Sequence, residues 1–294
     1  MINFSNLAEL TSIAREKSLP IHEVVIAREM HISLRSREHI IKQMADSWMV
    51  MQESIERGLN NTEKSLSGLT GGDARRLRLY SSKAGAEAPY LGEAAILAAA
   101  AAVGVNEVNA VMGRIVACPT AGSCGIVPAA LYAAKQRGAS EEKLVLSLFT
   151  AAGIGMVIDQ NASIAGASGG CQAECGTAAA MAAGALVEIA GGGPEKVGEA
   201  VALSVKNLLG LVCDPVAGLV EVPCVKRNGF AVIEAMLAAD MALSGIKSVI
   251  PVDEVIGAMD KIGRALPKSL RETSQGGLAV TPTARRIERE LYGE

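Results

Sequence analysis

The sequence predicts an all-α fold, a single helical domain in which helices alternate with Gly/Ser/Thr-rich loops. Half of its 294 residues are hydrophobic but only 3% are aromatic, so the core must be built from Ala, Val, Leu, Ile and Met. Small side chains let helices approach closely, whereas a β-sandwich would show Val, Thr and aromatic alternation. No segment of the sequence alternates apolar and polar residues with the period of two that half-buried strands require.

The chain is expected to form one catalytic domain over residues 1–294, with an N-terminal helical extension (1–58) ahead of a cluster- and substrate-binding core (59–294). Apolar residues recur at helical intervals in the extension. Three helices are expected there, over residues 6–17, from Pro20 to about Met30, and over 37–57.

All three histidines, His22, His31 and His39, fall in these first helices beside charged residues. Surface or capping roles are expected for them, because none lies in a glycine-rich loop. The sequence therefore lacks an obvious histidine base.

The core continues as helix after helix, with prolines and capping residues marking several starts, such as Pro89, Ser140 and Pro194. A basic helix is expected to begin after residue 74. Further helices are expected over about 89–103, 107–114, 129–137, 141–158, 171–190, 194–208, 230–244, 253–266 and 283–292.

Composition excludes some classes of function. A net charge of −3 shows none of the excess of basic residues that is typical of nucleic-acid-binding proteins. The longest uncharged apolar runs, 144–158 and 94–105, fall short of the roughly 20 residues of a spanning helix, so no membrane segment is expected. With no secretory signal at the N-terminus, we expect a cytoplasmic protein. Its six cysteines are then metal ligands, reactive thiols or buried small hydrophobes rather than disulfides.

Residues 210–229 form an unusual stretch, too broken for a helix and too apolar for a surface loop. Cys213 and Cys224 each lie close to a proline in it. Cys171 follows a glycine pair at a helix start, where the helix dipole favours a thiolate, and Cys175 is one turn on. The spacings are not those of zinc ribbons or ferredoxins, so a metal site and buried cysteines remain equally open from spacing alone.

Four loops gather glycines and hydroxyls, over residues 65–74, 118–128, 159–170 and 271–279. The first, SLSGLTGGDA, precedes a basic helix and can aim backbone N–H groups and hydroxyls at an anion. It lacks the ending of a Walker A loop. An ordinary helix-entry turn is an equally good interpretation. Cys118 and Cys124 in the second loop are expected to be small hydrophobes.

Over essentially its whole length the sequence resembles the α subunit of iron–sulfur-dependent L-serine dehydratases in their two-subunit form. The motifs that carry this resemblance are SLSGLTGGDA, CPTAGSCGIVP, NASIAGASGGCQAECG, GLVCDPVAGLVEVPCVKRN and RETSQGGLA. Several long motifs in one order are far more specific than a single short one.

The resemblance implies a [4Fe–4S] cluster held by three cysteines separated by 41 and 10 residues, which here are Cys171, Cys213 and Cys224. Cys175 is then not a ligand. Single-chain relatives can reach the fourth iron with a C-terminal cysteine, whereas this chain ends LYGE. We therefore expect an open iron that acts as a Lewis acid on the hydroxyl of L-serine, giving pyruvate and ammonia without pyridoxal phosphate.

The small-residue loops are expected to hold the substrate's carboxylate and ammonium, with helix capping as an equally open role. Asp73 or Glu174 is expected at the ammonium, and Arg271 is a candidate carboxylate clamp. The expected substrate-binding residues are Ser67, Thr70, Gly71, Gly72, Asp73, Thr120, Gly122, Asn161, Ser163 and Arg271.

The catalytic base is unknown. Single-chain relatives carry a Ser-Ser-His-Thr-x-Gly-Pro motif that this sequence lacks, so the base is expected from a separate β subunit in an oligomer. Two alternatives remain, an iron–sulfur L-cysteine desulfidase and a non-catalytic cluster-binding subunit. A pyridoxal-phosphate dehydratase is disfavoured, since no lysine stands in a convincing cofactor-binding context.

Overall fold

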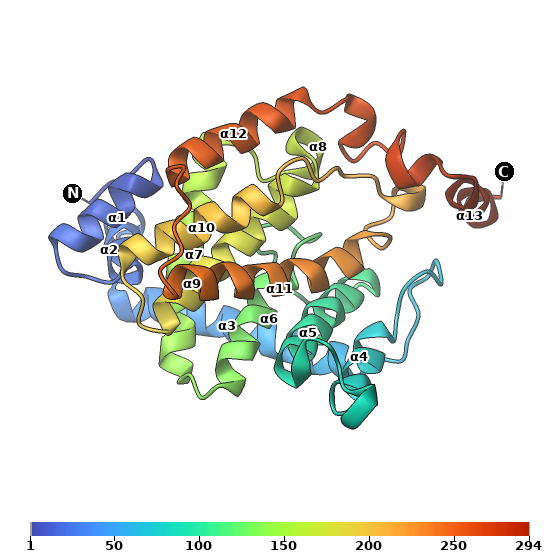
Figure 1. Ribbon diagram of the computed structural model, residues 1–294, viewed down its shortest axis with the longest axis horizontal. Coiled ribbons are helices and arrows are strands. Elements are labelled where there is room, and N and C mark those ends of the chain that lie inside the picture. The colour runs from blue at the N-terminus through green and yellow to red at the C-terminus, as the bar shows by residue number, and fades with distance from the viewer. Residues whose placement is uncertain (1, 294) are drawn as a thin grey trace.

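The computed structural model describes residues 2–293 and arranges them as one all-α domain (Figure 1). The predicted fold class is confirmed, and no strand occurs among these residues. The α-helices are α1 (Leu7–Glu16), α2 (Ile21–Ser33), α3 (Arg37–Asn60), α4 (Asp73–Ser81), α5 (Gly92–Ala110), α6 (Ile126–Gln136), α7 (Glu141–Asn161), α8 (Gly166–Gly169), α9 (Thr177–Ile189), α10 (Pro194–Asn207), α11 (Cys224–Leu243), α12 (Val252–Ala265) and α13 (Pro282–Tyr292). Short turns of 3-10 helix are η1 (Gly85–Glu87), η3 (Val216–Gly218), η4 (Lys268–Leu270) and η5 (Gly277–Val280), and η2 (Gln172–Gly176) is a π-helical turn.

Helix α9 is the centre of the domain, packed against α6, α7, α10 and α11 (Figure 1). Its sequence, TAAAMAAGALVEI, is apolar on all sides as far as Glu188, and such a helix is buried on all sides. Gly184 shows how closely its neighbours approach. A Cβ atom at this position would lie 2.2 Å from Cδ1 of Ile154 on α7.

Helices α3 and α5 cross through a glycine pair. A Cβ atom at Gly58 would lie 2.3 Å from the carbonyl carbon of Gly104, so the two backbones touch. The prediction of separate helices over 89–103 and 107–114 is wrong, because α5 runs without a break. Gly104 does not interrupt the helix, since its missing side chain is what permits the crossing.

The three N-terminal helices confirm the predicted ones to within a few residues and pack on the rest of the domain. Leu7, Leu10 and Trp48 belong to the same hydrophobic core as α9. The Asp253 carboxylate on α12 accepts from the backbone N–H of Leu7 at 2.8 Å, at the first turn of α1. The division of the chain at residues 58 and 59 stays a prediction.

The irregular stretch is shorter than expected. Residues 210–229 do not lack helix throughout, because α11 begins at Cys224. Pro223 stands immediately before the first helical residue, where its missing N–H costs no intrahelical hydrogen bond. This arrangement places the Cys224 thiol at the start of a long helix.

Two stretches, residues 85–110 and 141–161, are long and apolar enough by composition to cross a membrane. Half of the most apolar part of the first and 61% of that of the second are buried inside the fold. Core helices of folded domains pass the same test, and α5 and α7 are packed against other helices on several sides.

Candidate functional site

Three buried thiols from separate elements lie near one another. Cys171 precedes the π-helical turn η2, Cys213 lies in the irregular segment, and Cys224 begins α11. Only 2%, 2% and 6% of these residues are exposed, and all three are free cysteines. Burial, and then the negative charge of Cys171, raises the pKa of the Cys213 thiol, and the same causes raise that of Cys224 to about 12. The thiols are therefore close enough to influence one another electrostatically.

The backbone around Cys213 is satisfied by the segment after α12. Its N–H donates to the Leu270 carbonyl at 2.9 Å, and its own carbonyl accepts from the Glu272 N–H at 2.8 Å. These bonds form an isolated parallel bridge between Cys213 and Arg271. A buried, irregular segment thus obtains backbone partners from a part of the chain nearly 60 residues away.

A half-buried cation, Arg227, lies beside the thiols. The Arg227 guanidinium donates to the Asp214 carboxylate at 2.9 Å and to the Val212 carbonyl at 2.8 Å. The pKa of the Cys171 thiol is lowered, first by its hydrogen bond with Cys175, whose sulfur is 3.4 Å away, and then by the charge of Arg227. A lowered pKa favours the thiolate, which is the form that binds metal.

Glu174 lies in the π-helical turn η2, which sets its position, and it is only 9% exposed. Such turns occur often at functional sites. Thr120 Oγ1 donates to the Glu174 carboxylate at 2.8 Å, and burial raises the pKa of this acid. Cβ atoms at Gly122 and Gly166 would lie 3.2 and 2.8 Å from its oxygens. The two loops reach the carboxylate because they carry glycine at these positions.

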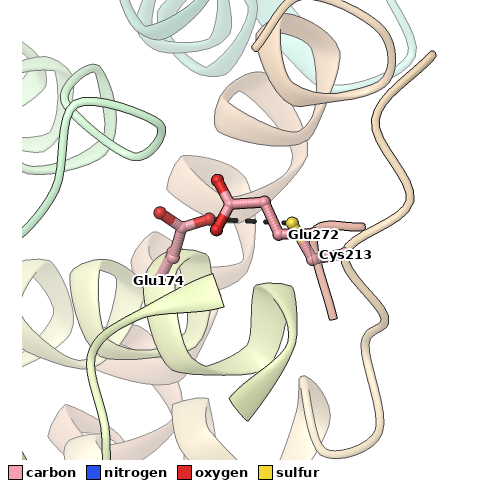
Figure 2. A group of neighbouring side chains, drawn as sticks. All are labelled: Glu174, Cys213 and Glu272. Carbon is pink, nitrogen blue, oxygen red and sulfur yellow. Dashed lines mark hydrogen bonds between the residues drawn. The ribbon is translucent and has the colours of Figure 1, made fainter. Parts of the chain in front are cut away.

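A second carboxylate faces the first. Figure 2 shows Glu174, Cys213 and Glu272 close to one another. One ligand atom from each residue lies within 4.8 Å of those of the other two. Glu272 has a φ of 60°, in the left-handed region that few non-glycine residues adopt. Sequence reasoning quoted the loop RETSQGGLA but singled out Arg271 and missed Glu272. The only sequence signal for Glu272 as a site residue was that it is the single acidic residue of the RETSQGGLA motif.

Among the predicted substrate-binding residues, Thr120 and Gly122 lie directly at Glu174. Those of the first loop face other partners. Ser65 and Ser67 donate their hydroxyls to the Glu221 carboxylate at 2.6 and 2.8 Å. Glu221 belongs to the irregular segment between Cys213 and Cys224, so this loop is tied to the cysteine segment.

The second half of the loop over residues 65–74 also binds a carboxylate of the chain itself. The Asp73 N–H, beside Gly72 at the start of α4, donates to the Glu107 carboxylate at 2.7 Å. The Asp73 side chain forms ion pairs with Lys226 and with Arg76, both at 2.7 Å. The left-handed backbone at Gly71 and Gly72 shapes this turn, and Thr70 is fully buried. The loop does bind carboxylates, and both belong to the chain itself.

The remaining predicted residues lie elsewhere. The Asn161 amide donates to the Val157 carbonyl at 2.8 Å and to the Ser5 carbonyl at 2.7 Å, so it ends α7 and ties the N-terminus. Ser163 and Arg271 are brought together, in a cavity of about 410 Å³. Neither Glu174 nor Cys213 lines that cavity.

The histidines lie on other elements. His22 on α2 contacts the Glu188 carboxylate of α9 at 2.8 Å, and His31 and His39 are exposed on α2 and α3. The residues described around the thiols and Glu174 are therefore acids, a threonine and an arginine, without a histidine.

The donor set fits a soft metal centre. The three free thiols of Cys171, Cys213 and Cys224 lie near one another in a buried place. Arg227 favours the thiolate of Cys171, and the carboxylates of Glu174 and Glu272 lie next to Cys213. Thiolates suit iron–sulfur clusters and other soft metal ions. Cys175 supports Cys171 by hydrogen bonding, and its own pKa is raised well above the usual value, first by that bond and then by burial.

Comparisons with known proteins all identify serine dehydratases as relatives of this chain. A family model described as serine dehydratase alpha chain matches residues 16–279. A probable L-serine dehydratase alpha chain of Bacillus subtilis is 52% identical over 293 residues, 99% of this chain and 96% of the relative. The L-serine dehydratase alpha chain of Peptoniphilus asaccharolyticus is 42% identical, covering 97% of each chain. L-serine dehydratase TdcG of Escherichia coli is 39% identical over 95% of this chain, which spans 62% of that longer protein.

Proposed function

The chain belongs to the family of serine dehydratase alpha chains, and from this premise we propose that it is the α subunit of an enzyme that converts L-serine to pyruvate and ammonia. Family membership supports dehydration of L-serine. The observation that carries the finer proposal is the convergence of Cys171, Cys213 and Cys224 beside two carboxylates.

Cys171, Cys213 and Cys224 would hold a [4Fe–4S] cluster. With one iron free of protein ligands, a bound cluster supplies a Lewis acid for the departing hydroxyl. The chain's own contribution is to favour the thiolate form of Cys171 and to keep water away from all three ligands. Arg227 and Cys175 lower the pKa of Cys171, and burial of all three thiols excludes bulk water.

Glu174 and Glu272 are placed to receive the α-ammonium of the substrate. Two carboxylates that face one another repel until a cation comes between them, and no Lys or Arg side chain among residues 2–293 forms an ion pair with either of these acids. Thr120 fixes the Glu174 carboxylate, and Gly122 and Gly166 leave room for it. In this proposal the loop over residues 65–73 shapes the surrounding structure, because Ser65 and Ser67 donate to Glu221 and the Asp73 N–H donates to Glu107.

The α-proton of the substrate goes to a base that a β subunit supplies. Two observations support this part of the proposal. The histidines of this chain lie on α2 and α3, away from the thiols. TdcG, a relative named as an L-serine dehydratase without a chain designation, is longer than the region matched here. We place the α–β complex in the cytoplasm, as an oligomer.

A turnover assay tests the proposal. The α subunit is reconstituted anaerobically with iron and sulfide, and pyruvate formation from L-serine is followed with and without the β subunit. We expect turnover that depends on both chains and no absorbance of a pyridoxal aldimine. Full turnover by the α subunit alone would contradict the origin of the base. Much faster turnover of L-cysteine than of L-serine would contradict the substrate.

A further inference from the structure

The cavity that Ser163 and Arg271 line lies between α8, η2 and α12, and the thiols do not line it. Its volume of about 410 Å³ falls in the range of about 300–1,000 Å³ that is typical of small-molecule sites. Glu174, Glu272 and the three cysteines do not line it. The polar side chains in its lining are Ser163, Ser168, Gln172, Asp260, Arg264 and Arg271.

The charges in this cavity do not balance. Arg264 Nε donates to both oxygens of Asp260, at 3.0 and 2.9 Å, so these two charges cancel. Gln172 is engaged at both ends of its amide, because Nε2 donates to the Met259 carbonyl and Oε1 accepts from the Gly210 N–H. Arg271 alone has no carboxylate partner among residues 2–293, which leaves one uncompensated positive charge at the cavity.

Arg271 is also incompletely hydrogen-bonded. Its Nη1 reaches only the Ser168 carbonyl, at a long 3.4 Å, and its Nε is buried without a partner within the described chain. A buried donor without a partner costs stability. Rotation of the guanidinium toward a bound anion would relieve that cost. The planar fork of an arginine side chain matches the two oxygens of a carboxylate.

We propose that this cavity binds a small carboxylate, held by Arg271 and by the hydroxyls of Ser163 and Ser168. Ser163 Oγ already accepts from the Ala165 N–H at 3.1 Å, so its proton remains available for a ligand. The net charge of the lining favours a monoanion over a more highly charged group such as a phosphate dianion.

The site goes beyond the proposed function, since it needs neither the cluster nor the two facing carboxylates. Two residues that line the cavity nevertheless lie close in sequence to the two facing carboxylates. Arg271 and Glu272 are consecutive and flank the bridge to Cys213, and Gln172 and Glu174 belong to the same π-helical turn. A ligand on Arg271 therefore contacts the segment that positions Glu272.

Calorimetric titration of the cluster-free α subunit with sodium pyruvate, at constant ionic strength, tests the proposal. We expect saturable binding with one site per chain. Arg271→Gln should weaken it at least tenfold, whereas Arg271→Lys, which keeps the charge but loses the fork, should weaken it less. Lys268→Gln is the matched control, because it removes a positive charge three residues away that does not line the cavity. Circular dichroism of each variant reports whether it is folded.

Two further titrations test whether the site is separate from the thiols and which class of anion it prefers. Binding that survives in Cys213→Ser supports a site distinct from the thiols, and binding lost in that variant overturns the separation. Inorganic phosphate should bind more weakly than pyruvate, and tighter binding of phosphate overturns the carboxylate class. Equal affinity for pyruvate in folded Arg271→Gln and in the unchanged chain, or the absence of saturable binding, overturns the proposal itself.

Discussion

Glu107 and Glu174 are both buried glutamates next to a glycine-containing loop, but they face different groups. Glu107 accepts from the backbone N–H of Asp73 at 2.7 Å at the start of α4. Glu174 has one hydroxyl donor, Thr120, and otherwise faces Cys213 and Glu272. Burial raises the pKa of both acids. Glu107 Oε1 holds the start of α4, and its Oε2 is buried without a partner in the described chain. Glu174 is bound by Thr120 at one oxygen and contacts Cys213 Sγ at 4.0 Å with the other. The first carboxylate therefore belongs to the protein's own backbone structure, whereas the second lies at the thiols.

The same contrast separates whole loops. The loop over residues 65–73 has the composition of an anion site, and the chain fills it with Glu107 and Glu221. The loop over residues 118–125 carries fewer hydroxyls, yet it closes on Glu174 beside the thiols. Composition therefore identifies a loop that can bind a charged group. Only the fold determines whether that group comes from the chain or from a ligand.

The largest expected effect is on catalysis. Glu174→Gln keeps the shape of the side chain and its acceptor for Thr120 but removes the charge that faces the substrate's ammonium. We expect kcat/KM for L-serine to fall about 100-fold, which corresponds to about 2.7 kcal/mol of transition-state stabilisation, with little change in the melting temperature. Steady-state kinetics of the cluster-loaded α–β enzyme measures this, with iron content as the control. An unchanged kcat/KM would remove Glu174 from the substrate site.

Glu107→Gln is the matched substitution on the other side of the comparison. It replaces a carboxylate at the start of α4 with an amide whose N–H₂ group finds no acceptor in a fully buried position. We expect a loss of about 2 kcal/mol in the free energy of unfolding, seen in chemical denaturation. The kcat/KM of the folded enzyme should stay within about twofold of normal. A large catalytic loss without destabilisation would reverse the assignment of the two acids.

Glu234 on α11 extends the comparison to a half-buried acid outside the site. It has a single hydroxyl partner, Ser204 at 2.9 Å, and burial raises its pKa from 4.5 to about 7. The folded protein therefore binds more protons than the unfolded chain between these values, so stability falls as the pH rises from about 4.5 to 7. The full loss is on the order of 3 kcal/mol. Glu234→Gln should flatten this part of the stability profile in denaturation at several pH values. An unchanged slope would show that Glu234 is already ionised in the fold.

The smallest expected effect concerns Ser67. Ser67→Ala removes one of the two hydroxyls on Glu221, while Ser65 remains bound to that carboxylate. We expect a loss of about 1 kcal/mol in the free energy of unfolding and an unchanged KM for L-serine. Thermal unfolding and initial-rate kinetics measure the two quantities. A KM raised tenfold with normal stability would return Ser67 to the substrate site that the sequence predicted.

Much of the fold follows from local sequence. Apolar helices such as α9, capping residues such as Ser140, and the prolines that open α10 and α13 all act within a few residues, and the predicted helices match them. One exception is α5. Its continuity depends on contact between Gly104 and Gly58, which lie 46 positions apart in the sequence. Local pattern alone does not reveal such a contact.

The site was less predictable because its partners are distant in sequence. Glu107 and Asp73 are 34 positions apart, and Glu221 and Ser67 are 154 apart. Spacing did not choose among the cysteines either, and the choice of Cys171, Cys213 and Cys224 rested on resemblance to a family. Glu272 reaches Glu174 only because the bridge to Cys213 fixes the segment after α12.

Iron and sulfide analysis of anaerobically reconstituted cysteine variants tests the central claim most directly. Cys171→Ser, Cys213→Ser and Cys224→Ser are compared with Cys175→Ser, which is equally buried and only 3.4 Å from Cys171. The account predicts that each of the first three loses the broad iron–sulfur absorbance, while Cys175→Ser retains about four irons and four sulfides per chain. A full complement of iron and sulfide in any one of the first three, or its loss in Cys175→Ser alone, would contradict it.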